Sequence, residues 1–407
     1  MTHSSIPGAF IDMHIVQTLP LSGLNLDSDG NPKSVVIGGV QRARLSPQAQ
    51  KRPVRQHIER ALPEEAACRT RRLVHAVRDL LIEQGWTDDV ATLAARDVFA
   101  AASGGMNIGA KNEDDQGQDD RPKDPLATAE LIYTPDSTAG RLATVASEHR
   151  DAYETAAKQP PTEAKPKTTA RSKKTANKTI ADASALEGLL ASANGTIALF
   201  GRTLMKIGGA ERNASVQVSS AFTTHEAIVE VDFFVAVDDY AAQTPGIPDV
   251  GQMGDSQQTA GTFYRYATIG LTGLLNQIDG DLELARRLCH GFIDGFINTL
   301  PKTGQTNSAA WTLPDLVHIA VRSDRPVNLS TAFDKPVRPG HNGHAGPSID
   351  ALATYAHSIE KITAKRGLVH TVHAHTGTKE LTGLGERTDS YDQAAQTALD
   401  AAFGTGQ

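Results

Sequence analysis

The sequence predicts a mixed α+β domain that is interrupted by long inserted segments. Stretches of alternating apolar and polar residues, typical of strands, are interspersed with stretches whose apolar residues recur at helical spacing. No stretch repeats at a fixed period. Polar loops separate strands that we expect to be neighbours in one sheet, which favours one domain with insertions over a string of independent domains.

Composition narrows the function classes. At 407 residues the chain has room for two or three domains, or for one domain with long insertions. Its net charge of -7 confines any nucleic-acid-binding surface to a local patch. Cys68 and Cys289 match no metal-ligand or redox spacing, and the N-terminus has no signal-peptide pattern, which predicts a reducing, cytoplasmic setting. The strongest apolar run, 233–237, is too short to cross a bilayer, so we expect no membrane role.

In the first half of the chain, periodicity and helix start and stop signals predict the elements. Residues 10–19 alternate between apolar side chains and the polar Asp12 and His14, which predicts a strand. An amphipathic helix begins at Pro63 and is stopped by Gly85. The other expected elements are helices at 87–103, 137–157 and 183–200 and a short strand or edge at 127–134.

In the second half, residues 215–269 predict a long hairpin or projecting arm. Its expected strands are 215–222, 226–237 and 262–269, with a flexible, glycine-rich tip at 244–262. Alternation predicts further strands at 316–322 and 368–375, and helical spacing predicts helices at 282–299, 348–366 and 390–403. We expect Ser348 to cap the helix at 348–366 and Gly367 to stop it.

Three polar segments are expected to be loops. Residues 24–33 are rich in turn-forming residues. Residues 111–124 are polar and acidic, which is typical of a surface loop. Residues 158–179 are rich in Pro, Thr, Ala and Lys but poor in apolar residues, which predicts a disordered or extended segment.

One basic stretch, 38–55, stands out in this acidic chain because it carries cations and amides but no carboxylate. Two glycines open it, and Arg42 and Arg44 then share one face of an extended run. Ser46 before a proline is typical of a helix N-terminus. Four side chains then fall on one helical face: Gln48, Lys51, Arg52 and Arg55. This pattern favours a phosphate-binding site over a merely solvated basic face, although Pro53 is expected to kink or shorten the helix.

Aromatic residues on the expected arm suggest contacts with bases. Phe233 and Phe234 face opposite sides of a strand, so we expect one of them to be exposed and able to stack on or wedge between bases, which is worth about 1–3 kcal/mol per base. Residues 263–266 resemble the aromatic sheet surface of RNA-recognition folds. Arg202 is either a further phosphate ligand or part of a buried ion pair.

Catalytic and metal-binding patterns are weak. The chain has none of the nucleophile-elbow, phosphate-loop, zinc-protease or dinucleotide motifs. His370, His373 and His375 are the best metal candidates, but His370 faces opposite to the other two in a strand, so surface histidines are the preferred interpretation. Asp27 and Asp29 could hold Mg²⁺ against a phosphate, although loop aspartates are usually turn residues.

These residues together resemble the CasC family, which forms the backbone of the type I-E CRISPR surveillance complex Cascade. The resemblance extends over most of the chain, and its order and spacing are specific. It is carried by Phe10, Ile11 and His14, residues 22–25, 38–55 and 201–202, Thr223-Thr224-His225, residues 231–234 and 236–239, Gly261 with 263–267, 332–335 and 347–349.

The resemblance implies a right-hand shape without enzymatic activity. It implies an RNA-recognition-motif-like (ferredoxin-like) palm formed by 1–59, 196–224 and 263–407, with inserted helical fingers at 60–195 and a thumb hairpin at 225–262. About six copies would polymerise along one CRISPR RNA, and each thumb would displace every sixth base. Implied guide contacts are Lys33, Arg42, Arg44, Ser46, Gln48, Lys51, Arg52, Arg55, Arg202 and Thr203. The implied base-displacing residues are His225, Phe233, Phe234 and Val235.

The resemblance also implies partners but no cofactor or metal. The partners are the CRISPR RNA, the target DNA strand paired to it, and further copies of the chain. Others are the large and small Cascade subunits, the subunit that caps the guide 5′ end, the guide-processing endonuclease and a recruited helicase-nuclease, all serving antiviral defence. Two alternatives remain open: a metal-dependent RNA endonuclease that uses Asp27, and a lone binder of cellular RNA.

Overall fold

The structure is a computed structural model that describes residues 6–109, 124–158, 179–186, 188–204, 207–239 and 250–404. The chain divides into two compact units: unit 1 is formed by residues 1–61 and 215–407, and unit 2 by residues 62–214. Nearly all of the expected loops at 111–124 and 158–179 lie outside the described residues. Among the described helices, none combines the length and apolarity needed to span a bilayer.

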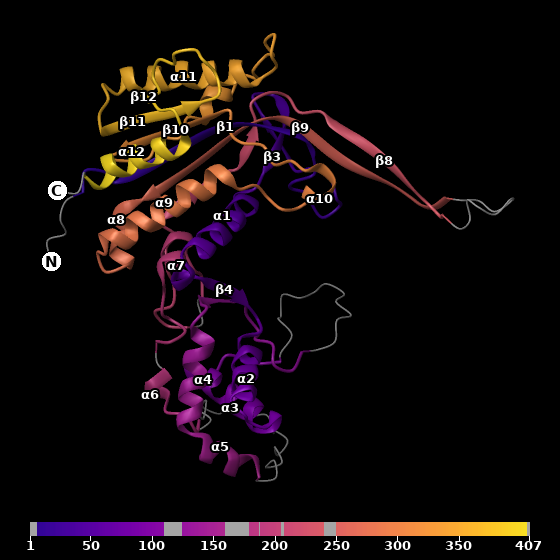
Figure 1. The fold of residues 1–407 in the computed structure, drawn as a ribbon, viewed down its shortest axis with the longest axis vertical. Coiled ribbons are helices and arrows are strands. Elements are labelled where there is room, and N and C mark those ends of the chain that lie inside the picture. Colours follow the sequence, from indigo (N-terminus) through magenta and orange to yellow (C-terminus); the bar gives the residue numbers. More distant parts are fainter. Residues whose placement is uncertain are drawn as a thin grey trace, which may run out of the picture. The chain divides into compact units, whose positions relative to one another are not determined.

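Unit 1 is built on a large, mostly antiparallel sheet, so the expected mixed α+β class is confirmed (Figure 1). The order of its main path is β12-β11-β10-β1-β9-β7-β3-β2, and β6 and β8 also pair with β9. The strands are β1 (Phe10–Ser22), β2 (Ser34–Ile37), β3 (Val40–Leu45), β6 (Val216–Val218), β7 (Ala221–Thr223), β8 (Val229–Val237), β9 (Val250–Gly270), β10 (Leu316–Arg322), β11 (Leu368–His375) and β12 (Glu386–Arg387).

Helices cover both faces of this sheet. On one face lie α9 (Leu282–Asn298) and α12 (Tyr391–Phe403), with α1 (Pro47–Ala61) and α8 (Leu271–Gln277) packed against α9. On the other face lie α11 (Ala345–Ile362) and the short 3₁₀ helix η3 (Ser330–Phe333). Figure 1 shows α11 and α12 on opposite sides of β10 and β11. A short helix, α10 (Gln305–Ser308), contacts β1.

The helix layers bury the centre of the sheet completely. Tyr264 in β9 packs against Phe333 of η3, with ring centroids 5.0 Å apart, while its neighbour Arg265 lies over the ring of Phe296 in α9. Tyr264 is fully buried and Arg265 is 1% exposed. The expectation that residues 263–266 form an exposed aromatic surface for RNA is therefore wrong, because a helix covers each face.

Arg265 is a buried cation that has no carboxylate partner among the described residues. Its guanidinium donates hydrogen bonds to Oε1 of Gln17 (2.6 Å), to the carbonyl oxygen of Phe296 (2.8 Å) and to Oε1 of Gln50 (3.4 Å). Burial lowers the pKa of Arg265 to about 9, so the side chain is still charged at neutral pH. These bonds join strand β1, strand β9, helix α1 and helix α9 at one point.

Three histidines form a row across the sheet. His14, His318 and His373 lie directly opposite one another on β1, β10 and β11. The rings of His14 and His318 stack with centroids 5.3 Å apart. Nδ1 of His318 donates to the carbonyl oxygen of Val372, and Nδ1 of His373 donates to that of Leu384. All three are buried, so the preferred interpretation of His373 as a surface residue is wrong.

Unit 2 is mainly helical and has its own core. Its elements are η1 (Pro63–Glu65), β4 (Ala67–Thr70), α2 (Leu73–Glu83), α3 (Asp88–Ala102), β5 (Ile132–Pro135), α4 (Thr138–Glu148), α5 (Arg150–Ala157), α6 (Ala183–Leu186) and α7 (Gly195–Phe200). Apolar faces of α2, α3 and α4 meet around Val77, Phe99 and Leu142, which are fully buried. Strands β4 and β5 form a separate two-stranded sheet.

Several expected helix boundaries in unit 2 are wrong. The helix expected from Pro63 begins at Leu73, because residues 67–70 pair with 132–135 instead. The helix expected at 137–157 is two helices that meet at His149, and 183–200 holds two short helices. Residues 196–214, part of the segment expected in the palm, group with unit 2.

The main differences in unit 1 concern β9 and α11. Residues 250–259, expected as part of a flexible tip, are paired with β8 and form about half of a long strand, while 240–249 lie outside the described residues. Helix α11 begins at Ala345, so Ser348 is not its cap. The buried hydroxyl of Ser348 donates a hydrogen bond to the carbonyl oxygen of His344 and forms another with Oγ1 of Thr224.

We expect Arg265→Met to lower the free energy of unfolding by about 3 kcal/mol, because it leaves the acceptors on Gln17 and Phe296 buried without a donor. Urea denaturation followed by circular dichroism measures the change. Arg366→Met is the matched control, because Arg366 is exposed. Equal stabilities of the two variants would contradict the structural role of the buried cation.

The histidine row predicts that the protein loses stability in mild acid. Burial lowers the pKa of His318 to about 3 and that of His14 well below its ordinary value. Below a pH of about 6.5 the unfolded chain therefore binds protons that the folded chain excludes, and each such histidine costs about 1.4 kcal/mol per pH unit. The loss of stability between pH 7.5 and 5.5, measured by urea denaturation, should shrink by about this amount in His318→Gln. His290→Gln, at an exposed position of α9, should leave the loss unchanged.

Candidate nucleic-acid interface

The basic stretch begins in a tight hairpin. Strands β2 and β3 are joined by Gly38 and Gly39, both with positive φ (59° and 81°), which is the geometry of a two-residue turn. A Cβ atom at Gly38 would overlap the carbonyl oxygen of Asp334. Glycine at 38 is therefore required both for the turn and for the close approach of the two backbones.

The two arginines of β3 differ in accessibility. Arg42 is fully buried, and its guanidinium donates to the carbonyl oxygens of Thr223 (2.8 Å) and Phe333 (3.1 Å). Burial lowers the pKa of Arg42 below its ordinary value. Arg44 is half-buried and donates to Oγ of Ser220 at 3.3 Å. Arg42 is therefore inaccessible to a ligand, whereas Arg44 is partly accessible.

Helix α1 begins as the sequence predicts. Oγ of Ser46 accepts a hydrogen bond from the backbone N–H of Ala49, and Pro47 is the first helical residue. The N–H of Ser46 donates to Oδ1 of Asn25 at 2.7 Å, which ties the helix start to the preceding loop. Ser46 is itself nearly buried, so its hydroxyl serves the helix.

The outer face of α1 carries the polar side chains. Gln48 and Arg52 are exposed, and Lys51 and Arg55 are half-buried. Arg55 forms an ion pair of 2.5 Å with Glu59, one helical turn away. The opposite face is buried through Gln50, Pro53, Val54 and Ile58. The predicted single polar face is confirmed, and the outward side chains Gln48, Lys51, Arg52 and Arg55 are called the α1 basic face below.

Pro53 does not shorten α1, contrary to the expectation. It lies on the buried face, and the helix continues to Ala61. Val54 and Ile58 pack against α9 where Gly295 and Gly291 remove side-chain bulk. Packing along this face compensates for the one backbone hydrogen bond that proline cannot donate.

The loop before β2 brings Lys33 next to the basic stretch. The N–H of Lys33 donates to the carbonyl oxygen of Asn25, and its own carbonyl oxygen accepts from the N–H of Arg44. In the same loop, Oδ1 of Asp27 accepts from the N–H groups of Asp29 and Asn31 at 2.9 Å each. These bonds lower the pKa of Asp27 and give its carboxylate a turn-forming role.

Strands β8 and β9 form a two-stranded ribbon with apolar side chains in solvent. Phe233 is 61% exposed and Phe234 is 47% exposed, so both sides of β8 present an aromatic ring, where one was expected. The ring of Phe234 lies across the ribbon over Gly254, its partner in the register. Other large exposed apolar residues are Ile228, Val231, Val235, Val237 and Met253.

The same ribbon is acidic. Residues 226–262 contain seven carboxylates and neither lysine nor arginine. Glu230, Asp232 and Asp255 are exposed on the paired strands. Phosphate groups are repelled by such a surface, so the ribbon can contact bases or protein but cannot follow an RNA backbone. The excess of carboxylates is visible in the sequence, but only the pairing of β8 with β9 shows that these charges lie on one ribbon.

His225 lies at the base of the ribbon and is nearly buried. Its Nδ1 donates to the carbonyl oxygen of Glu226 (2.7 Å), and its Nε2 accepts from the N–H of Thr262 (3.1 Å). The ring stacks on His344 with centroids 3.7 Å apart, and burial lowers the pKa of His225. Its contacts fix the root of the ribbon, whereas Phe233, Phe234 and Val235 lie in solvent further along it.

Arg202 and Thr203 belong to unit 2. The Arg202 guanidinium is buried and donates to the carbonyl oxygens of Ala210 (2.7 Å), Ser192 (2.8 Å), Ala191 (2.8 Å) and Tyr133 (3.1 Å). The sequence left two roles open for Arg202, a phosphate ligand or part of a buried ion pair. Among the described residues it has neither role, because its guanidinium is inaccessible and is held by carbonyl oxygens. Burial and the charge of Arg212 lower the pKa of Arg202 to about 10. Thr203 is exposed.

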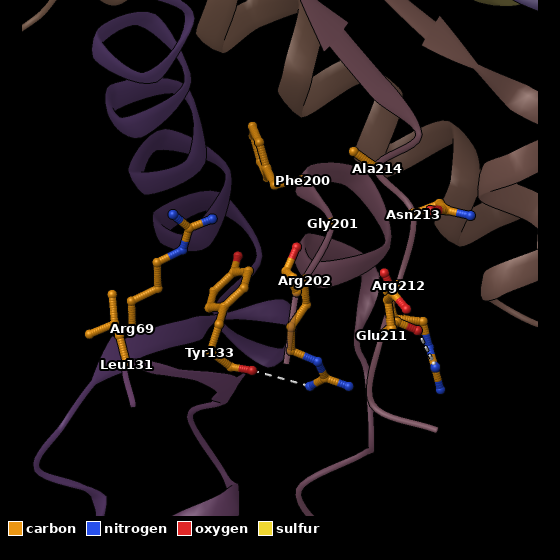
Figure 2. A pocket seen from close by; sticks show the side chains of 11 residues that line it. Arg69, Leu131, Tyr133, Phe200, Gly201, Arg202, Glu211, Arg212, Asn213 and Ala214 are labelled. Carbon is orange, nitrogen blue, oxygen red and sulfur yellow. Dashed lines mark hydrogen bonds between the residues drawn. The ribbon is translucent and has the colours of Figure 1, made fainter. Parts of the chain in front are cut away.

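Unit 2 has a recess of about 420 Å³ at this place, and Figure 2 shows the side chains that line it. Arg69, Leu131 and Tyr133 line one wall, and residues 200–203 and 211–214 line the other. Gly201 has a φ of 75°, and a Cβ atom there would lie 2.8 Å from the backbone nitrogen of Ala214. No sequence pattern singles out Arg69 or Tyr133, which are 64 positions apart and meet through the pairing of β4 with β5.

The geometry therefore groups the predicted residues into three sets. Lys33, Arg44 and the α1 basic face follow one another around the start of α1. The ribbon carries Phe233, Phe234 and Val235. Arg202 and Thr203 lie at the recess of unit 2. Among the described residues, His, Cys, Asp and Glu form no cluster of three or more that could hold a metal ion.

Comparisons with known proteins agree with this architecture. Residues 11–398 match the model of a family described as "CT1975-like protein". A solved structure titled "CRISPR RNA-guided surveillance complex, pre-nicking" contains a chain that is 36% identical, with a TM-score of 0.82. A second, titled "CRISPR RNA-guided surveillance complex", contains one that is 33% identical, with a TM-score of 0.73. Each match covers 97% of this chain and 100% of the other. A search of curated proteins found no match.

The family model covers most of the chain, and both structural matches extend over its length at more than 30% identity. The resemblance predicted from the sequence is confirmed. The chain belongs to the CT1975-like family, the CasC backbone proteins of type I-E Cascade.

Proposed function

We propose that this protein is a non-catalytic backbone subunit that binds CRISPR RNA and polymerises along it. The observation that carries the proposal is the separation of two surfaces within unit 1. The α1 basic face offers cations and an amide, while the β8–β9 ribbon offers aromatic rings without any cation. A protein that holds RNA by its phosphates and displaces bases needs both kinds of surface.

The α1 basic face binds the phosphates of the RNA. Arg52 and Gln48 are exposed, Lys51 and Arg44 are partly so, and the helix N-terminus adds the positive end of its dipole. Arg55 contributes less, because it shares its charge with Glu59. Contacts of this kind are independent of base sequence, which suits a subunit that must hold any guide.

The β8–β9 ribbon displaces the bases. Exposed Phe233 and Phe234 can stack against bases, while Glu230, Asp232 and Asp255 repel the backbone phosphates. Exposed rings together with carboxylates favour insertion of the ribbon between bases over contact along the RNA backbone. We assign the displacement of every sixth base to this element, with Val235 beside the two rings.

In this assignment unit 1 without the ribbon is the RNA-recognition-motif-like palm, unit 2 corresponds to the fingers, and the ribbon is the thumb. About six copies would assemble head to tail along one guide, since the same two surfaces on each copy face successive RNA segments. The target DNA strand pairs with the guide, and the other Cascade subunits and the helicase-nuclease complete the defence complex. A cytoplasmic location suits this role.

The nucleic acid that copurifies with the chain and its companion subunits tests the proposal directly. We expect a short, uniform, repeat-derived RNA, identified by sequencing. A heterogeneous pool of cellular RNA would instead favour a general RNA binder. Complexes free of nucleic acid, with no affinity for a CRISPR transcript, would overturn the proposal.

Arg52→Ala and Lys51→Ala should weaken guide binding for every spacer sequence alike. Each lost phosphate contact should reduce the slope of log K against log salt concentration by about 0.7 to 1. Filter binding between about 50 and 200 mM salt measures the slope for two unrelated spacers. Lys361→Ala, an exposed lysine on α11, is the charge-matched control and should leave the slope unchanged. A loss restricted to one spacer would argue against phosphate contacts.

A further inference from the structure

We infer that the recess of unit 2 is a binding site for one unpaired nucleotide, held between the Arg69–Tyr133 pair and the backbone of residues 200–203 and 211–214. The inference rests on the proposed function for the presence of nucleic acid. It adds Arg69 and Tyr133 to the contacts that the resemblance implies, because these two residues line the same recess as Thr203.

The first support is the state of Arg69. Its guanidinium lies over the ring of Tyr133, 4.6 Å from the centroid, and the side chain is exposed. Within the part of the chain that the structure describes, Arg69 forms no ion pair or side-chain hydrogen bond. Its donors are therefore available to a ligand, and the tyrosine ring holds the guanidinium plane in position.

The second support is the charge of the lining. Three arginines, Arg69, Arg202 and Arg212, line the recess, and Glu211 is the one acidic residue in its lining. The donors of Arg202 and Arg212 are engaged by carbonyl oxygens, so these two contribute charge without being free to bind directly. An anion is therefore favoured in the recess, and Arg69 is the group that would bind it.

The third support is size and shape. A volume of about 420 Å³ accepts one nucleotide but excludes a duplex. Leu131 and Phe200 supply apolar surface beside the charges, as a base with its phosphate requires. Single-stranded nucleic acid is commonly read by bases that stack on guanidinium planes and aromatic rings. A base stacked on Arg69, with Tyr133 behind it, reproduces this arrangement.

The nucleotide has two possible sources, the guide RNA or a DNA strand, and photo-crosslinking of the assembled complex separates them. One set of complexes carries 5-iodouridine at successive guide positions. Two other sets carry 5-iododeoxyuridine in the target strand or in the displaced strand. Mass spectrometry then maps each cross-linked peptide. We expect a cross-link to the peptide containing Tyr133 or Phe200 in one of the sets, and that set identifies the strand.

Variants at position 69 test the site itself. Arg69→Ala should reduce the cross-link yield about tenfold or more, and Arg69→Lys should have an intermediate effect because it keeps the charge but loses the planar stack. Arg72→Ala is the matched control, since Arg72 is also exposed, lies three residues away and does not line the recess. Thermal denaturation verifies that each variant is folded.

The guide content of each preparation separates the two possible failures. Complexes without RNA would overturn the proposed function. Complexes with normal RNA content, but with no cross-link to the recess in any set, or with a yield that Arg69→Ala leaves unchanged, would overturn this inference alone.

Discussion

A single buried cation connects helix α1 to the sheet. Arg265 sits in the middle of β9 and holds acceptors on β1, α1 and α9 at once. Because Gln50 on the inner side of α1 takes part, the orientation of the helix about its own axis is fixed from below. That orientation determines which side chains of α1 point outward. The accessible cations of unit 1 thus depend on a charge that never reaches solvent.

Whether an arginine is buried or accessible depends on its neighbours in the fold and not on its sequence context. Arg42 and Arg202 both occur in stretches that look suited to phosphates, and both end in cages of carbonyl oxygens. Arg44, Arg52 and Arg69 keep part or all of their guanidinium in solvent. Burying a cation costs less when its donors are hydrogen-bonded, so the carbonyl oxygens around Arg42 and Arg202 make their burial tolerable, whereas the other three arginines keep donors for ligands.

Elements with strong local signals were predictable from the sequence. The strands at 10–22, 316–322 and 368–375 alternate clearly, and the helix expected at 390–403 is α12, where the side chain of Ser390 accepts from the N–H of Gln393. The outward face of α1 followed from spacing alone. Residues 250–258 carry no such signal, because glycine, glutamine and serine dominate them, and they become a strand only through pairing with β8. The cage around Arg42 is equally hidden, since its acceptors lie 181 and 291 positions away.

The division of the chain into units has a consequence for biosynthesis. Unit 2 is one continuous segment, whereas the central strands of unit 1, β1 and β9, are separated by the whole of unit 2. During translation, unit 2 can complete its core while β1 still waits for its partner strand to leave the ribosome. The exposed apolar strand would then need protection from premature association. An early, independent collapse of unit 2 shortens the effective loop that the two halves of unit 1 must close.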